Sequence, residues 1–282
     1  MTVDSLVTNY APPSLVADSL TFAYPGQAAV LDGLSFAPKP GALTVLLGAN
    51  GAGKTTLLRL LAGQLAPSAG RVLLDGRPIL SQSRRDIARR LTLMPQSERR
   101  DTPLAVRDVV ALGRCAHRGW WQPLTDDDEA RIDAALAATD LAPLADRPVT
   151  TLSGGQWRRV VLARAIAQDA AVLLLDEPTA GLDLKHQYEA LARVRDLVAS
   201  CGLIAVVSLH DLQLAAAFAD AAVLLDGGRL LASGTCEEVL TPAAIRQAYD
   251  VEVVVATHPT SGRPMVVPAA YPAAKTTGAS PC

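Results

Sequence analysis

The sequence predicts an α/β fold with a parallel sheet whose strands are covered on both faces. Three apolar runs, at residues 43–47, 171–176 and 203–208, are continuous rather than alternating, which is typical of strands buried on both faces. Helix-prone stretches separate these runs, as expected for a layered α/β core. The chain has 282 residues, half of them hydrophobic, so one large domain with a subdomain can bury a sizeable core.

Other β-rich runs accompany this core. LVADSLTFAY precedes the first buried run, and RVLLD, AVLLD and VEVVV follow at intervals along the chain. Each is rich in branched or aromatic residues and predicts a further strand.

The middle of the chain differs because it carries helical patterns and no continuous strand from about residue 97 to 151. Residues 104–114 and 125–140 each predict a helix, and Thr125 is suited to cap the second one, whose first turn is acidic. We therefore expect a helical subdomain inserted into the α/β core. The expected organisation is a flexible leader at 1–14, an α/β core at 15–96 and 168–265, a helical subdomain at 97–167 and a flexible tail at 266–282.

Composition argues against several classes of protein. The net charge is −2, which disfavours nucleic acid as the main partner. The four cysteines form no CxxC pair, so they indicate neither a zinc site nor a disulfide framework. No apolar run approaches the roughly 18 residues of a transmembrane helix, and the first residues do not resemble a signal peptide. We therefore expect another chain to supply the membrane part if the protein works at a membrane.

The most specific motif follows the apolar run at 43–47. GANGAGKT, at residues 48–55, fits the pattern GxxxxGK[ST] without a mismatch. Glycines let the backbone wrap with its N–H groups pointing inward, and the helix expected to begin near Lys54 directs its positive end at an anion. Lys54 is suited to the β- and γ-phosphates, and the Thr55 hydroxyl to Mg²⁺. Against the alternative of an ordinary glycine-rich turn, we expect nucleotide contacts from Gly48, Asn50, Gly51, Ala52, Gly53, Lys54, Thr55 and Thr56.

AVLLLDEP supplies two carboxylates at the end of a buried strand. A lone carboxylate at Asp176 would be costly there, and a bound Mg²⁺ offsets that cost. Glu177 follows at once, where a carboxylate can orient or deprotonate an attacking water. The alternative is a polar strand end followed by a turn.

LSGGQ, at residues 152–156, forms a third motif. Ser153 and Gln156 have the spacing of a capping box for the helix that follows. Gly154 and Gly155 also expose backbone N–H groups at a helix N-terminus, which is a second device for binding phosphate. A protein with two such grips on different lobes can use one on its own nucleotide and the other on a partner's.

In their order along the chain, GANGAGKT, LSGGQ and then LLLDEP, the three motifs resemble those of the nucleotide-binding subunits of ATP-binding cassette (ABC) transporters, over roughly residues 16–265. The resemblance implies a P-loop NTPase (RecA-like) core with an N-terminal antiparallel β part and an inserted α-helical subdomain. It also implies an ATPase whose cofactors are ATP and Mg²⁺ and whose hydrolysis is coupled to transport across a membrane.

The same resemblance implies roles for further residues. Tyr24 would stack on adenine, with a surface tyrosine as the alternative. Gln96 would sense Mg²⁺ and the attacking water, Asp183 would cross a dimer interface, and His210 would contact the γ-phosphate. The implied catalytic residues are Glu177, His210 and Gln96, the implied metal ligands are Thr55, Gln96 and Asp176, and the implied partner-side contacts are Ser153, Gly154, Gly155 and Gln156.

The resemblance also implies an assembly. Two copies of the chain would form a homodimer with two ATP molecules between them. The dimer would lie peripherally on the cytoplasmic side of the inner membrane, against an integral membrane permease. A periplasmic or lipoprotein substrate-binding protein would act through the complex, and no nucleic acid is expected.

The transported compound is indicated by softer matches. VVALGRCAHRGWW, LADRPVTTLSGGQ and the stretch from residue 240 to 268 are similar to ATPases of iron–siderophore, haem and cobalamin importers, and the C-terminal stretch resembles the ferric-siderophore members most. We expect import of an iron chelate, namely a ferric siderophore, with haem or cobalamin as alternatives.

Two other classes stay open at this point. A soluble ABC ATPase acting on nucleic acid would use the basic run formed by Arg84, Arg85, Arg89, Arg90, Arg99 and Arg100, although solvated helix faces or a surface for a membrane partner account for it as well. A catalytically dead cassette is disfavoured because Lys54, Asp176, Glu177 and His210 are all present.

Three tryptophans depart from the shared pattern or stand apart from it. Trp157 occupies a position where the family commonly has a basic or polar residue, and we expect it to alter packing rather than remove activity. Trp120 and Trp121 fall in the helical subdomain. One hypothesis is that one of them packs on the permease, and the alternative is that both pack within the subdomain.

Overall fold

The fold is that of a computed structural model, which describes residues 12–118 and 122–269. The first 11 residues of the expected leader, Trp120 and Trp121, and the end of the expected tail from residue 270 lie outside the described residues. No helix within the described ranges combines the length and the apolar character needed to cross a membrane.

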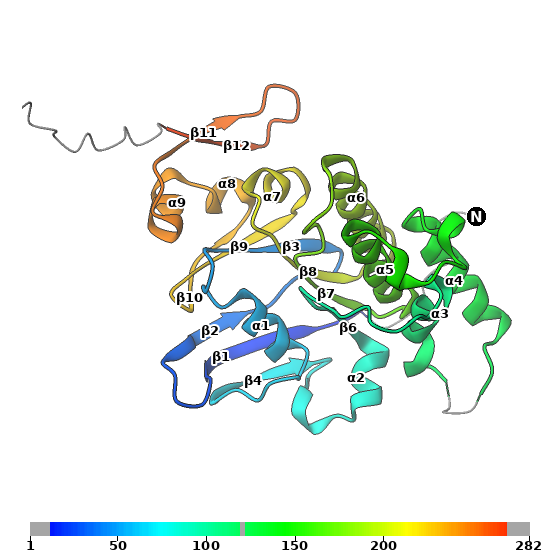
Figure 1. Ribbon diagram of the computed structural model, residues 1–282. Coiled ribbons are helices and arrows are strands. Elements are labelled where there is room, and N and C mark those ends of the chain that lie inside the picture. The colour runs from blue at the N-terminus through cyan, green and yellow to red at the C-terminus, as the bar shows by residue number, and fades with distance from the viewer. Residues whose placement is uncertain (1–11, 119–121, 270–282) are drawn as a thin grey trace, which may run out of the picture.

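A six-stranded sheet in the order β10-β9-β3-β8-β7-β6 lies at the centre of the molecule (Figure 1). Neighbouring strands from β9 to β6 are parallel, and β10 pairs antiparallel with β9. The parallel strands predicted at 43–47, 171–176 and 203–208 are confirmed as the adjacent strands β3, β7 and β8. The strands are β3 (Ala42–Leu47), β6 (Leu91–Met94), β7 (Val172–Asp176), β8 (Ile204–Ser208), β9 (Ala221–Asp226) and β10 (Arg229–Gly234).

The predicted N-terminal antiparallel part is confirmed as a second sheet, in the order β2-β1-β4-β5. Helix α1 lies between the two sheets (Figure 1). Its Leu57 and Leu61 are fully buried in one cluster with Leu20 of β1 and Val206 of β8. The elements are β1 (Leu15–Ala23), β2 (Ala29–Phe36), α1 (Lys54–Leu61), β4 (Ala69–Leu74) and β5 (Arg77–Pro78).

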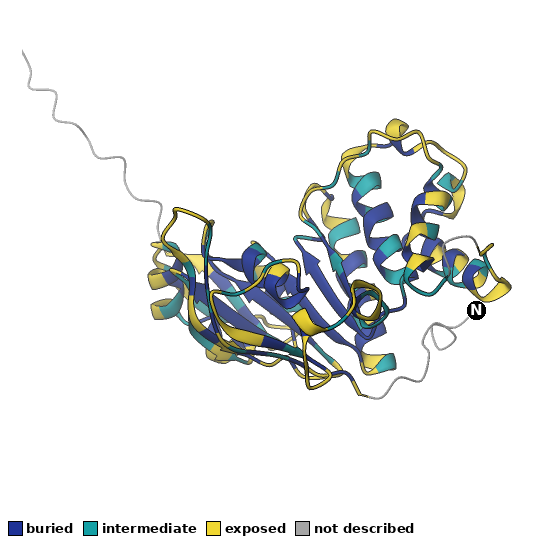
Figure 2. Cartoon of the chain, turned by 90° about the horizontal axis from the view of Figure 1, so that it is seen from below, coloured by how far each residue is buried: buried dark blue, intermediate teal, exposed yellow. Residues whose placement is uncertain are grey.

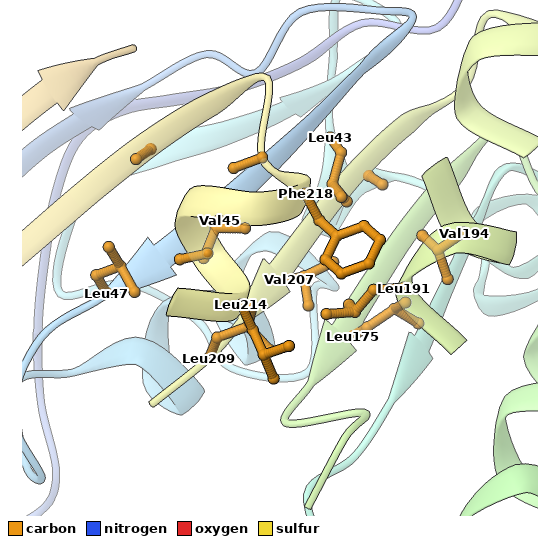
Figure 3. Close-up of a cluster of buried hydrophobic side chains, with 14 of the residues drawn as sticks. Leu43, Val45, Leu47, Leu175, Leu191, Val194, Val207, Leu209, Leu214 and Phe218 are labelled. Carbon is orange, nitrogen blue, oxygen red and sulfur yellow. The ribbon is translucent and has the colours of Figure 1, made fainter. Parts of the chain in front are cut away.

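The opposite face of the six-stranded sheet is covered by helices. Leu175 of β7 and Val207 of β8 point into the same cluster as Leu191 of α6 and Phe218 of α7 (Figure 3). Both faces of the parallel strands are therefore buried, which explains their continuous apolar sequences. The helices are α6 (Leu184–Cys201), α7 (Leu212–Phe218), α8 (Cys236–Val239) and α9 (Pro242–Tyr249).

A C-terminal hairpin of β11 (Val253–Thr257) and β12 (Pro264–Pro268) extends the ordered chain past the tail boundary expected at residue 266. Val266 is buried, and its carbonyl accepts a hydrogen bond from Gln213 Nε2 of α7. Arg263 Nη1 donates to Ala216 O of the same helix at 2.8 Å. These contacts hold the hairpin on α7, and nothing in the local composition indicates them.

The helical part forms an arm that projects beside the sheets (Figure 2). Its helices α3, α4 and α5 enclose a separate apolar cluster. Thr125 caps α4 with a full capping box, as predicted. The helix predicted at 104–114 is divided, because a 3-10 turn brings Gly113 against α5, where an added Cβ would lie 2.5 Å from Arg164 O. The elements are α3 (Val106–Ala111), the 3-10 turn η3 (Leu112–Ala116), α4 (Asp126–Ala138) and α5 (Gly154–Ala167).

The basic run on α2 (Arg84–Arg90) is more than a solvated helix face. Arg85 and Arg89 each donate from Nε to the carbonyl oxygen of Ala116, at 3.1 and 3.0 Å. Arg90 forms a 2.7 Å ion pair with Asp75. These arginines tie α2 to the helical arm and to the antiparallel sheet.

Candidate active site

The segments that follow four neighbouring parallel strands meet at one edge of the six-stranded sheet. Carboxyl ends of parallel strands share an edge, where ligands bind in open α/β sheets. The strand register brings them level, because Ser208 of β8 lies opposite both Leu46 of β3 and Asp176 of β7. In the sheet order β3-β8-β7-β6, the segments are the glycine loop (residues 48–56), His210, Asp176 with Glu177, and Gln96.

Two positions of the glycine loop require glycine. Gly48 has a φ of 142°, and a Cβ there would lie 2.5 Å from Leu225 O. Gly53 has a φ of 99°, and a Cβ would lie 2.7 Å from Leu31 Cδ2. Helix α1 begins directly after Gly53 with no side-chain cap and no acidic residue in its first turn. The first amides of α1 therefore lack the side-chain acceptor that caps most helices, which suits them to an anion.

Lys54 is buried at the base of this loop, with 6% of its surface exposed. Its Nζ donates to Gly48 O at 2.6 Å and to Ala49 O at 3.1 Å. Burial lowers the pKa of the Lys54 ammonium, and the carboxylates of Glu177 and Asp176 act in the opposite direction. The loop therefore encloses one positive charge opposite two negative ones.

The two carboxylates of LLLDEP have different surroundings. Asp176 is 2% exposed, and its Oδ1 accepts a 2.6 Å hydrogen bond from Ser208 Oγ. The same Oγ accepts from the Glu177 amide at 2.9 Å. Glu177 has a φ of 51°, a costly left-handed conformation for a residue with a Cβ, and its Oε1 contacts His210 Nε2. The structure thus brings the three predicted residues together: Ser208 joins Asp176 to Glu177, and the Glu177 carboxylate contacts His210.

A hollow of about 220 Å³ opens beside these residues. Thr55, Asp176 and Pro95 are among the residues that line it, and the exposed Gln96 follows Pro95 directly. A hydroxyl, a carboxylate and an amide are oxygen donors of the kind that Mg²⁺ prefers, so this donor set fits the ion.

Tyr24 lies beside the first turn of α1. Its hydroxyl is 3.4 Å from Thr56 Oγ1, and its ring makes an edge contact with Phe22 at a centroid separation of 4.9 Å. The structure therefore places an aromatic ring next to the glycine loop, where the sequence predicts contact with a base.

The signature segment (residues 152–156) starts α5. Ser153 Oγ accepts from Gln156 N at 3.2 Å, and Gln156 Oε1 accepts from Ser153 N at 3.0 Å, so the predicted capping box is confirmed. An added Cβ on Gly155 would lie 3.3 Å from both Gly181 O and Leu182 Cδ2. The contacts of this segment therefore run to the turn before α6.

Asp183 ends that turn. It caps α6 by accepting from the His186 amide at 2.9 Å, and its Oδ1 is also 2.6 Å from His186 Nδ1. These hydrogen bonds hold the pKa of the Asp183 carboxyl below its usual value. The predicted signature and Asp183 residues form a second group, on the exposed side of the arm and the α6 turn.

Three further residues support the site, and the sequence analysis assigns a role to only one of them, the packing residue Trp157. Tyr249 on α9 accepts a 2.8 Å hydrogen bond at its hydroxyl from the Gly48 amide, across 201 positions. Trp157 donates from Nε1 to Glu98 O at 3.0 Å and packs between α5 and its neighbours, as expected of a packing residue. Arg158 is buried beside Asp176 and Glu177 and contacts their carbonyls.

Known proteins match this arrangement. The family model described as "ABC transporter" matches residues 31–180, more than half of the chain. Over 240 residues the chain is 48% identical to the hemin import ATP-binding protein HmuV of Nocardia farcinica, covering 85% of this chain and 82% of that one. It is 44% identical to the cobalamin import ATP-binding protein BtuD of Halobacterium salinarum, covering 85% and 60% of the two chains.

A siderophore protein and a solved structure also match. The achromobactin transport ATP-binding protein CbrD of Dickeya dadantii is 37% identical, covering 90% of this chain and 94% of that one. An inward-facing metal-chelate type ABC transporter superposes with a TM-score of 0.78 at 28% identity, covering 91% and 97% of the two chains.

The motifs, their convergence at one sheet edge and these matches give the same answer. The fold expected from the sequence is confirmed, and so is the ATP-hydrolysing class. This chain belongs to the ABC transporter family, as an ATP-binding subunit that hydrolyses ATP.

Proposed function

We propose that this chain powers the import of an iron chelate through a separate membrane permease, on whose cytoplasmic side it sits as a peripheral subunit. The observation that carries the proposal is the similarity to a hemin import ATP-binding protein over 85% of the chain. A substrate-binding protein would deliver the chelate to the permease. The chain itself would contact neither the chelate nor the substrate-binding protein, because it would act on transport through the permease.

Haem is the cargo that the matches favour. The hemin import proteins of Nocardia farcinica and Streptomyces coelicolor are 48% and 44% identical to the chain. A ferric siderophore is the second candidate, because the achromobactin and petrobactin proteins are each 37% identical over 90% of the chain and the C-terminal stretch resembles that group.

Ligand-stimulated hydrolysis tests the cargo. The chain is purified with its permease in lipid nanodiscs, and ATP turnover is measured with the binding protein loaded with haem, metal-free protoporphyrin, a ferric siderophore or cobalamin. We expect haem to stimulate turnover severalfold and the porphyrin without iron to do so less. Stimulation by the siderophore alone would replace haem by the second candidate, and stimulation by none of the iron chelates would reject the proposal.

The chemistry we propose begins with the glycine loop. Lys54 and the first amides of α1 bind the β- and γ-phosphates, and the ring of Tyr24 stacks on adenine. Thr55, Asp176 and Gln96 would hold Mg²⁺, which when bound neutralises phosphate charge. The buried cation and the uncapped helix start support this assignment.

Glu177 is the proposed base for the attacking water. The Glu177 carboxylate lies at the strand ends near Lys54. Its Oε1 contacts His210 Nε2 and so holds the His210 ring in a position from which the ring can reach the γ-phosphate. General base catalysis of this kind contributes about 10²- to 10⁴-fold to a rate.

We also propose that the chain works as a homodimer. The signature segment starts α5, on the arm that projects beside the sheets in Figure 2. Its Ser153 and Gly154 are exposed. In the dimer these residues would contact the γ-phosphate held by the partner's glycine loop, and Asp183 would cross the interface. Binding of ATP would then favour the closed pair, and hydrolysis would release it.

Replacing Ser153 by arginine tests the partner-side contact. We expect nucleotide affinity of the monomer within about twofold of wild type, with ATP-induced dimerisation lost and turnover reduced by about 100-fold. Equilibrium nucleotide titration measures the affinity, light scattering measures dimerisation, and a phosphate-release assay measures turnover. Thr235→Arg is the matched control, because Thr235 is also an exposed helix cap with a capping box. Normal dimerisation of the Ser153 variant would contradict the proposed contact.

A further inference from the structure

Arg158 joins two segments of the site to the signature helix. It lies on α5, one turn after Gly154, and is 7% exposed. Its Nη1 donates to the carbonyl oxygens of Pro95 and Gln96, at 2.9 and 2.7 Å. Its Nε donates to Glu177 O at 3.1 Å, and its Nη2 contacts the carbonyl oxygens of Asp176 and Glu177. One guanidinium therefore bridges the strand ends of β6 and β7.

The contacts to Glu177 act on a strained residue. Its left-handed backbone, at a φ of 51°, is held on the N–H side by Ser208 Oγ. On the carbonyl side the oxygen accepts from Arg158 and, at 3.1 Å, from the Ala180 amide. Because hydrogen bonds fix both peptide groups of Glu177, the direction of its carboxylate depends on them.

The segment around Gln96 is fastened to the same helix. Arg164 of α5 forms a bidentate pair with the Glu98 carboxylate at 2.6 and 2.7 Å. Trp157 Nε1 donates to Glu98 O, and Arg100 Nη1 donates to Leu152 O at 2.6 Å. Residues 95–100 therefore move with α5, and Arg158 extends this attachment to the end of β7.

We propose that Arg158 is a positioning residue that couples the position of the signature helix to the orientation of the Glu177 carboxylate. The inference rests on the proposed role of Glu177 as the base. A displacement of α5 relative to the sheet changes the hydrogen bonds at Asp176 O and Glu177 O first, so the base is aligned only when α5 is correctly placed. Arginine suits this task because its rigid fork carries five N–H donors, all of which can serve carbonyls.

Turnover and nucleotide affinity are measured for Arg158→Gln and Arg158→Lys in the full chain. We expect kcat to fall by about 30-fold in the glutamine variant and by less in the lysine variant, which keeps the charge. The affinity for ATP stays within about twofold, because the glycine loop is untouched. Arg159→Gln is the matched control, since it removes the same charge from the next position of the same helix, where Arg159 donates to Thr139 O of the arm at 3.3 Å.

A split between kcat and affinity supports the inference, whereas a purely structural role would lower the two together or leave kcat unchanged. If Arg158→Gln lowers the unfolding temperature too far, Arg158→Lys carries the test. A double-mutant cycle that combines Arg158→Gln with Glu177→Gln then separates the positioning role of Arg158 from the role of Glu177 as the base. Residual turnover of the double variant should equal that of Glu177→Gln alone, and additive losses would overturn the coupling. Normal turnover of Glu177→Gln alone would instead reject the base and leave the Arg158 contacts unexplained.

Discussion

Replacing Lys54 with alanine should remove ATP hydrolysis and weaken ATP binding by at least about 100-fold, which corresponds to about 2.7 kcal/mol. The loop encloses this cation, and Nζ lies on the carbonyl oxygens of Gly48 and Ala49. A triphosphate entering the loop brings several negative charges to a place where Asp176 and Glu177 already supply two more. Without the ammonium, the loop keeps its backbone amides and the hydroxyls of Thr55 and Thr56, none of which carries a full positive charge.

The measurement is an equilibrium titration with a fluorescent ATP analogue, followed by a phosphate-release assay. Lys39→Ala is the matched control, because it deletes the same charge at an exposed position outside the site. Thermal unfolding should place both variants close to wild type, since alanine at position 54 also removes the cost of burying an ammonium. An affinity within threefold of wild type would mean that the loop does not hold the phosphates through Lys54.

The sequence predicts the elements whose determinants are local. The parallel strands β3, β7 and β8 are visible as continuous apolar runs because both of their faces are buried. The starts of α4 and α5 are visible because a capping box is complete within four residues. The glycine loop is visible because its shape requires glycine at fixed positions, as the close approach of Gly48 to Leu225 O shows.

The interactions that the sequence does not reveal join distant residues through the main chain. Arg158 binds carbonyl oxygens 18 to 63 positions away, and every residue has a carbonyl, so no side-chain pattern marks the partners. The partner of Tyr249 is also unmarked in the sequence, because the Tyr249 hydroxyl accepts from a main-chain amide, that of Gly48. The basic run on α2 is misleading in a related way, because Arg85 and Arg89 both donate to a main-chain acceptor, Ala116 O of the helical arm.

Glu177→Gln should bind ATP as well as wild type while kcat falls by about 100- to 1,000-fold, within the range that a general base supplies. Glutamine has the same shape, so the backbone contacts with Ser208 Oγ and Arg158 survive and the glycine loop is unaffected. What is lost is the carboxylate proposed to accept a proton from water. In the proposed cycle closure needs ATP binding and opening needs hydrolysis, so the variant should accumulate an ATP-bound dimer.

Light scattering with Mg²⁺ and ATP measures that dimer, and single-turnover phosphate release measures the rate. Glu189→Gln is the matched control, since it also replaces a glutamate by glutamine. Glu189 lies on α6 and forms a surface ion pair with Lys185. Three outcomes are distinct. A slow enzyme that stays dimeric supports both the base and the clamp, and a slow enzyme that stays monomeric supports the base alone. Brisk hydrolysis would show that Glu177 is not the base, and it would leave His210, whose Nε2 contacts Glu177, as a candidate for that role.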